Sequence, residues 1–150
     1  MATRAHPNIE TLRAIYADLS CIDAYCANDV VLHTADREIQ GRPVHVIGKK
    51  AVHAKELELI AMTGNTLAMD VQDIIANDHF GAVLGILRAH LDGQDAAMPF
   101  CGLWRFRNGL VVEHWENAYD AHALGQFLVG QRGAHQATHA LSADPSLGDA

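Results

Sequence analysis

Residues 104–117 read WRFRNGLVVEHWEN, and this stretch decides the fold. An Asn-Gly pair between two apolar runs is the strongest short-range signal for a β-hairpin. The two arms carry both tryptophans of the chain, together with a histidine next to glutamates. A half-buried strand rarely turns such polar side chains inward unless something polar is bound there. The hairpin therefore predicts a ligand pocket.

The register of this hairpin decides which side chains enter the pocket, because a shift of one residue turns every side chain to the other face. A two-residue loop would pair Arg107 with Leu110. Glu113 and Trp115 would then share the face of Trp104.

A three-residue loop with a bulge is the alternative register. It would pair Phe106 with Leu110. His114 and Glu116 would then share the face of Trp104, and this is the register that we favour.

Composition limits the classes to which the protein can belong. The 150 residues fit one domain, and 49% apolar with 19% charged residues is typical of a folded chain. The net charge of −7 and the absence of a basic cluster larger than Lys49-Lys50 argue against nucleic-acid binding and against anionic membranes. No apolar run approaches the ~20 residues of a membrane span, and no signal peptide is visible. We therefore expect a cytoplasmic protein with reduced cysteines.

Helical periodicity and alternating strands succeed one another along the chain. Helices are predicted from Pro7-Asn8 onward and over residues 20–26, 51–62 and 120–128. Strands are predicted over residues 30–33, 67–76, 80–91, 96–107 and 110–118, with residues 34–46 irregular. We expect one domain over residues 1–129, followed by a mobile tail over residues 130–150.

Helices that precede a series of long, hairpin-connected strands predict the α+β class. The N-terminal helices would pack on a strongly curved antiparallel sheet and form a conical barrel with an apolar interior. The other sheet face would need a partner if it is apolar.

Three segments carry a family resemblance: ANDVVLH at 27–33, GKKAV at 48–52 and LWRFRNGLVVEHWE at 103–116. With them, residues 8–128 resemble the snoaL-like polyketide-cyclase branch of the nuclear-transport-factor-two-like superfamily, which has a cystatin-like fold. The resemblance implies a cone-shaped barrel, usually dimeric, with the pocket inside the cone. Similar proteins cyclise polyketides, isomerise steroids, open epoxides or only bind small molecules, so the fold leaves the function open.

The resemblance also implies a role for Glu116. In polyketide-cyclase members an acid commonly follows the tryptophan of the last long strand and acts as general acid/base. Glu116 stands at that position, where an Asp is more usual, and it supports the register with Glu116 inward. The Asp-Arg-Asp set of epoxide-opening relatives has no counterpart that we can locate.

The predicted site combines one acid, imidazoles and aromatic walls. Glu116 is the expected catalytic acid/base, with His114 and His33 as catalytic partners. The expected substrate-binding residues are Trp104, Phe100, His90 and Tyr16. No cofactor and no metal site is predicted, since the only close histidine spacing, His135 and His139, lies in the tail.

Two functions remain open from the sequence. The first is an enzyme that moves a proton on an apolar substrate, of the polyketide cyclase, isomerase or epoxide hydrolase type. The alternative is a non-catalytic dimeric protein that binds a hydrophobic small molecule. In both, the expected partners are a small hydrophobic molecule and a second copy, held through the outer sheet face with Trp115 as anchor.

Overall fold

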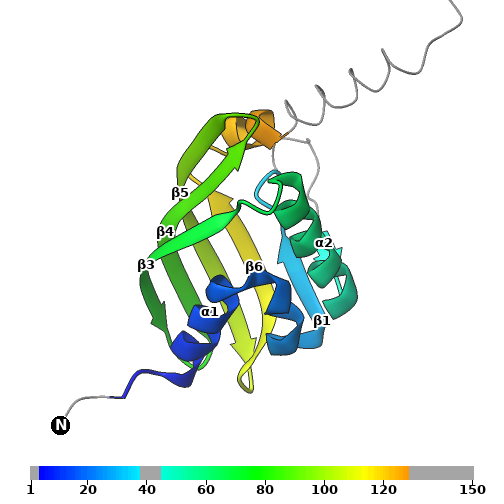
Figure 1. Ribbon diagram of the computed structural model, residues 1–150. Helices are drawn as coiled ribbons and strands as arrows, with labels where there is room; N and C mark the ends of the chain where they lie inside the picture. The colour runs from blue at the N-terminus through cyan, green and yellow to red at the C-terminus, as the bar shows by residue number, and fades with distance from the viewer. Residues whose placement is uncertain (1–3, 38–44, 129–150) are drawn as a thin grey trace, which may run out of the picture.

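The computed structural model describes residues 4–37 and 45–128 (Figure 1). The helical elements are α1 (Pro7–Ala17), the 3₁₀ helix η1 (Leu19–Tyr25) and α2 (Lys49–Met62), and residues 121–128 form a further short helix. The strands are β1 (Cys26–His33), β2 (His45–Ile47), β3 (Ala68–Ala76), β4 (Phe80–Leu91), β5 (Gln94–Arg107) and β6 (Leu110–Ala118). The predicted tail over residues 130–150 lies outside the described residues.

The strands form one sheet in the order β2-β1-β6-β5-β4-β3. All neighbouring strands are antiparallel except β1 and β6, which run parallel. Two expectations are corrected here. The sheet is not purely antiparallel. Part of the segment predicted as irregular forms β2, a three-residue strand that pairs with β1 and is too short to show a periodic sequence pattern.

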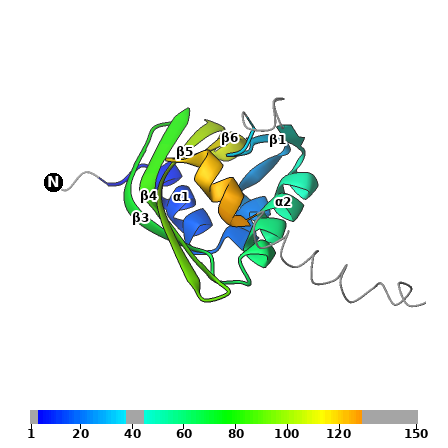
Figure 2. The same cartoon turned by 90° about the horizontal axis from the view of Figure 1, so that it is seen from above.

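The predicted α+β class is confirmed. Figure 2 shows the sheet curving around α1, with α2 beside β1 at the far edge. The core lies inside this curve, where Leu12 and Ile15 of α1 and Leu32 of β1 are fully buried. Removing such side chains from water supplies about 25 cal/mol per Å² of apolar surface, which holds the helices in the hollow of the sheet.

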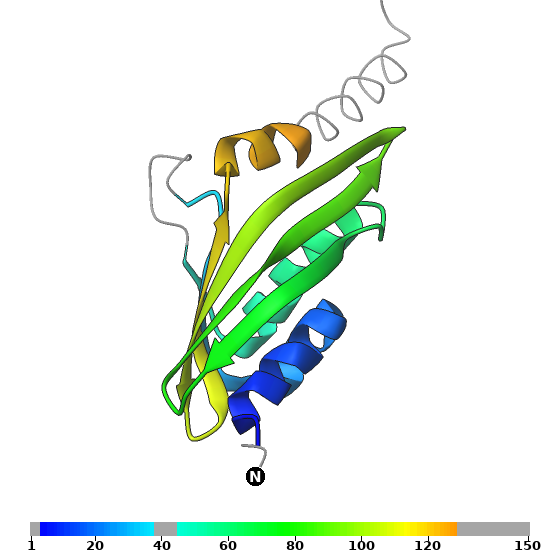
Figure 3. The same ribbon diagram turned by 90° about the vertical axis from the view of Figure 1, so that its left-hand side faces the viewer.

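The helix of residues 121–128 lies at the wide end of the curved sheet (Figure 3). Its first turn is capped by Asp120, because the backbone N–H of Ala123 donates to Oδ1 of Asp120 over 2.9 Å. The cap fixes the direction in which the chain turns back from β6. The helix therefore lies across the opening of the cone.

The hairpin between β5 and β6 combines features of both predicted registers. Its loop has two residues, with Arg107 paired to Leu110 and positive φ angles of 53° at Asn108 and 80° at Gly109. The three-residue loop that we favoured is therefore wrong. A register shift then follows between Arg105 and Phe106, and beyond it Trp104 pairs with His114. At this shift β6 has one residue more than β5. The extra residue returns His114 to the inner face of the sheet, beside Trp104, as in the register that we favoured.

No helix in the described part of the chain is long and apolar enough to cross a membrane.

Candidate functional site

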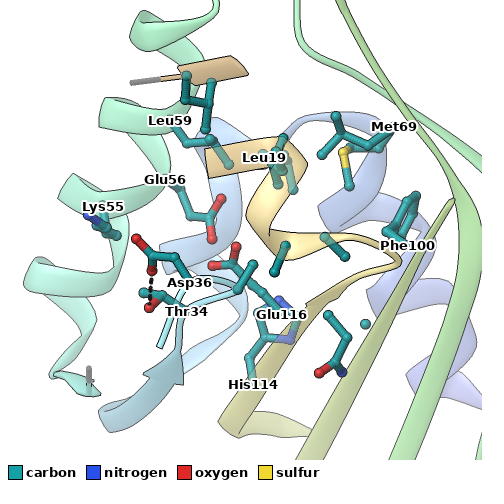
Figure 4. Close-up of a pocket in the computed structure, with 18 of the residues that line it drawn as sticks. Leu19, Thr34, Asp36, Lys55, Glu56, Leu59, Met69, Phe100, His114 and Glu116 are labelled. Atoms are coloured by element: carbon teal, nitrogen blue, oxygen red, sulfur yellow. Dashed lines mark hydrogen bonds between the residues drawn. The ribbon is translucent and has the colours of Figure 1, made fainter. Parts of the chain in front are cut away.

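A pocket with a volume of about 250 Å³ opens between α2, the inner face of β5 and β6, and the helix of residues 121–128. Figure 4 shows α2 on one side of it and β6 on the other. Most of its wall is apolar. The apolar side chains that line it include Leu19, Leu59, Met62, Met69, Leu87, Phe100, Leu124 and Leu128. The polar groups gather at one side, where α2 faces β6.

Two glutamates from distant parts of the chain meet in this pocket. Glu56 comes from α2 and is only 4% exposed, and Glu116 comes from β6. Figure 4 shows the two carboxyl groups pointing toward one another, and a side-chain hydrogen bond joins them. Because two carboxylates cannot share a hydrogen bond without a proton, the pair holds one between them.

Burial is the main reason that both carboxyl groups keep protons unusually well. It raises the pKa of Glu116 from 4.5 to about 7, although the hydrogen bond from Glu56 and the charges of Lys55 and Arg37 pull that pKa down. Burial, followed by the charge of Glu116, raises the pKa of Glu56 well above its ordinary value. Glu56 is therefore the proton donor of the pair, and Glu116 is the member that ionises near neutral pH.

Stacked rings form one wall of the pocket. The imidazole of His114 lies flat on Trp104, with centroids 3.4 Å apart and planes 13° apart. Trp104 donates its indole N–H to the hydroxyl oxygen of Tyr16 over 3.2 Å, and Tyr16 stacks on Phe100 at 5.5 Å. These four residues, all predicted for the site, are thus brought together and line the pocket.

His114 is held neutral. Its Nδ1 lies 2.9 Å from the backbone carbonyl oxygen of Leu103. Burial lowers the pKa of the imidazole from 6.5 to about 3, against a smaller opposite effect of that hydrogen bond. At neutral pH, His114 therefore supplies an uncharged ring next to the carboxyl pair.

Arg37 fixes the backbone on which Glu116 stands. Its guanidinium donates to the carbonyl oxygen of Glu116 over 2.7 Å and to that of Thr34 over 2.8 Å, and it also donates to Oδ1 of Asn117 over 2.9 Å. These bonds tie the end of β6 to the turn after β1. Arg37 was not predicted as a site residue, because it lies in a segment without periodicity.

His33 is not among the residues that line the pocket, and its predicted place there is corrected. In the parallel pairing of β1 with β6, His33 is opposite Trp115 and stacks on it at 5.2 Å. Its Nε2 lies 2.6 Å from Oε2 of Glu113. The fully buried Leu32 takes the inward position instead, because alternate residues of a strand face opposite sides.

His90 is exposed and also lies away from the pocket lining. Its Nδ1 is 2.5 Å from Oδ1 of Asp95, its partner across the β4–β5 hairpin. Inward positions on β4 fall on odd-numbered residues such as Val83 and Leu87, so the even-numbered His90 points outward. The predicted place of His90 in the pocket is corrected accordingly.

Glu56 is a second residue of the site that was not predicted from the sequence. Its signal was present, because Glu56 follows the buried Val52 by four residues and precedes the buried Thr63 by seven. Those spacings fall on one helical face. A glutamate on the buried face of a helix indicates a paired or functional carboxyl group.

Within the described ranges, no group of three or more His, Cys, Asp and Glu side chains is arranged to hold a metal ion. The pair His135 and His139 lies outside those ranges.

Gly102 of β5 leaves the space that the ring wall needs. A Cβ at this position would collide with the hydroxyl oxygen of Tyr16 and would lie 3.0 Å from Nε1 of Trp104. We expect Gly102→Ala to lower the free energy of unfolding by about 1–3 kcal/mol, the usual effect of overpacking. Urea denaturation measures this.

Gly125 is the matched control for Gly102, because a Cβ there meets no heavy atom within 4 Å. In the helix of residues 121–128, Gly125→Ala should stabilise the protein by about 0.5–1 kcal/mol. Equal effects of the two substitutions would contradict the packing at Gly102.

Solved structures with the same fold are numerous. Bal32a, from a soil-derived mobile gene cassette, superposes with a TM-score of 0.69 at 22% identity, covering 83% of this chain and 98% of that one. TerC, co-crystallised with polyporic acid, gives a TM-score of 0.67 at 20% identity, with 83% and 99% covered. A protein from Jannaschia sp. CCS1 assigned to the SnoaL-like polyketide cyclases gives 0.66 at 16% identity, with 84% and 96% covered. At these identities the likeness shows the fold alone.

Sequence comparison identifies the family directly. No curated protein matches the chain. The model of the SnoaL-like domain matches residues 11–114, from within α1 to the middle of β6. This match covers more than half of the chain, and we conclude that the protein belongs to the SnoaL-like domain family.

Proposed function

We propose that this protein is an enzyme that transfers protons by general acid/base catalysis on a small, largely apolar substrate. The observation that carries the proposal is the Glu56–Glu116 carboxyl pair, whose two members come from α2 and β6. Buried acids are retained rarely unless they serve a function or a fixed pairing. A polyketide cyclase or isomerase type of reaction agrees with the family and with the relative assigned to the polyketide cyclases.

Glu116 is the proposed base. A group that ionises near pH 7 is best suited to take a proton and to return it under neutral conditions. Its carboxylate would remove a proton from a C–H group next to a carbonyl. The C–H electron pair would form a C=C bond, and the π electrons of the carbonyl group would move onto its oxygen. The protonated Glu116 would then return the proton to another atom of the same substrate, so that no cofactor is consumed.

Glu56 is proposed as the positioning partner of Glu116. Because its pKa lies well above its ordinary value, it stays protonated and donates to the ionised Glu116. That bond orients the carboxylate and limits how strongly burial raises the Glu116 pKa. The test of this function is the turnover of a panel of enol, enone and epoxide substrates by the wild-type protein and by Glu116→Gln. A pocket ligand that stays unaltered, with no product from the panel, would instead favour a binding protein.

We propose further that a second copy covers the outer face of the sheet. Ile75, Phe80 and Leu103 are 65%, 55% and 42% exposed there. Strand pairing sets Ile75, Ala82, Leu103 and Trp115 in one row across β3, β4, β5 and β6. Such an apolar row is typical of an association surface.

We expect Leu103→Glu to weaken self-association about a hundredfold or more, because burying an unpaired charge costs several kcal/mol. Sedimentation velocity over a range of concentrations measures the change. Ile47→Glu on β2 is the control, since Ile47 is 68% exposed but does not belong to the row. A wild-type protein that is monomeric at all concentrations would contradict the proposed dimer.

A further inference from the structure

The tautomer of His114 is fixed by its surroundings. Nδ1 of His114 lies 2.9 Å from the carbonyl oxygen of Leu103. A carbonyl oxygen can only accept a hydrogen bond, so Nδ1 must carry the proton. Since the ring is neutral at ordinary pH, Nε2 then carries a lone pair and no hydrogen. His114 therefore offers the pocket an acceptor, whereas a protonated histidine would offer a donor.

Within residues 4–37 and 45–128, no side chain or backbone group donates a hydrogen bond to this acceptor. The carbonyl of Leu103 is the polar partner found for the ring, and that bond occupies Nδ1. Among the described residues no fully buried side-chain nitrogen or oxygen lacks a hydrogen-bond partner. Nε2 is thus accessible, and the ring of His114 is part of the pocket lining. Figure 4 shows His114 beside Glu116 at the polar side of the pocket.

Gly102 lies next to this edge of the ring. It pairs with Glu116 across β5 and β6, and Trp104 pairs with His114. A Cβ on Gly102 would lie 3.4 Å from Cε1 of His114, the carbon between the two ring nitrogens. The hydroxyl group of Tyr16 takes the space beside the glycine, so this group also lies near the edge of the His114 ring, and a ligand would reach Nε2 from the pocket.

We propose that His114 is a specificity-determining residue that accepts a hydrogen bond from a hydroxyl or N–H group of an uncharged ligand. The apolar part of the ligand lies along the apolar wall, of which Phe100 and Leu87 are part. A ligand that lacks the donor would leave Nε2 dry and unpaired, which is unfavourable. An anionic ligand would be repelled by the ionised Glu116. The inference deepens the proposed function by naming the substrate class, but it depends only on the pocket and not on proton transfer by Glu116.

Two probes of nearly equal shape test this recognition. 2-Naphthol carries a donor hydroxyl, and 2-methoxynaphthalene carries an ether that cannot donate. We expect wild-type protein to bind 2-naphthol about tenfold more tightly, as one hydrogen bond to a buried acceptor implies. In His114→Phe, which retains a ring against Trp104 but has no acceptor, the preference should disappear. Fluorescence titration measures all four affinities.

Nitrogen NMR of the wild-type protein is the second measurement and needs no variant. We expect Nδ1 of His114 to be protonated and Nε2 unprotonated between pH 5 and 8. 2-Naphthol should shift the Nε2 resonance, and 2-methoxynaphthalene should leave it in place. A proton on Nε2, equal binding of both probes, or no binding of 2-naphthol would overturn the inference. Glu116→Gln should keep the preference for 2-naphthol, so failure of the catalytic proposal would be recognised separately.

Discussion

Glu116→Gln should lower kcat by about a hundredfold or more on any substrate that the wild-type protein turns over, because general acid/base groups contribute about 10²–10⁴-fold. The amide keeps the size and much of the hydrogen bonding of the carboxyl group, but it cannot take up a proton. KM should change little, since the pocket shape is preserved. Steady-state kinetics on the responsive member of the substrate panel measures both constants.

Glu113→Gln is the matched control for this experiment. It lies on the same strand three residues earlier, but its carboxylate is on the outer face, where Arg105 and His33 bind it at 3.0 and 2.6 Å. The same chemical change at Glu113 should leave kcat within about twofold. The wild-type rate should also depend on one group that ionises near pH 7, the expected behaviour of Glu116. Unchanged turnover in Glu116→Gln would remove Glu116 from the chemistry.

The architecture could be predicted because its signals are local. The Asn108-Gly109 turn, the long alternating strands and the capping Asp120 each indicate one element with a short-range physical cause. The structure confirms the α+β class on that basis. β2 was missed because a strand of three residues, His45–Ile47, has too few positions to display a period.

The side chains of β6 that face inward were predicted correctly, although the predicted length of the β5–β6 loop was wrong. The two-residue loop by itself would turn Glu113 and Trp115 to the side of Trp104. One extra residue near Val112 reverses this, because a bulge changes which residues face inward beyond it. The position of a bulge cannot be predicted from the sequence alone. The loop length and the inward side chains of β6 therefore had to be inferred separately.

The site was only partly predictable because its members come from segments that are distant in the chain. His114 and Glu116 could be grouped, since residues two apart on a strand share a face. Glu56 is 60 residues before Glu116, and only the packing of α2 on the sheet brings the two together. His33 and His90 were misplaced because their facing depends on strand pairing that no local pattern fixes.

The same Glu116→Gln protein should be more stable than wild type at pH 8, although it is expected to be inactive. The folded-state pKa of Glu116 is about 7, against 4.5 as its ordinary value. The folded protein therefore holds this proton more tightly than the unfolded chain does. The stability that the folded protein gains from this tighter proton binding is fully present below pH 4.5 and is lost as the pH rises through 7.

The size of the effect follows from the difference between the two pKa values. A shift from 4.5 to about 7 corresponds to roughly 3 kcal/mol of lost stability once both states are ionised. At pH 8, Glu116→Gln avoids this loss and should gain on the order of 3 kcal/mol in the free energy of unfolding. At pH 5, where the wild-type carboxyl group is still protonated, the two proteins should differ by about 1 kcal/mol or less.

Urea denaturation at pH 5 and pH 8 measures the free energy of unfolding of each protein. Comparing each variant with wild type at the same pH removes the contribution of His114 to the pH dependence of stability. That contribution has the opposite sign, because the lowered pKa of His114 adds stability as the pH rises from 3 to 6.5. Glu113→Gln should behave oppositely to Glu116→Gln. Burial acts to raise the pKa of Glu113, but the hydrogen bonds from His33 and Arg105 lower it overall, so its ionised form stabilises the fold. If Glu116→Gln raised the free energy of unfolding equally at both pH values, the gain in stability would reflect packing and not the proton shared between Glu56 and Glu116.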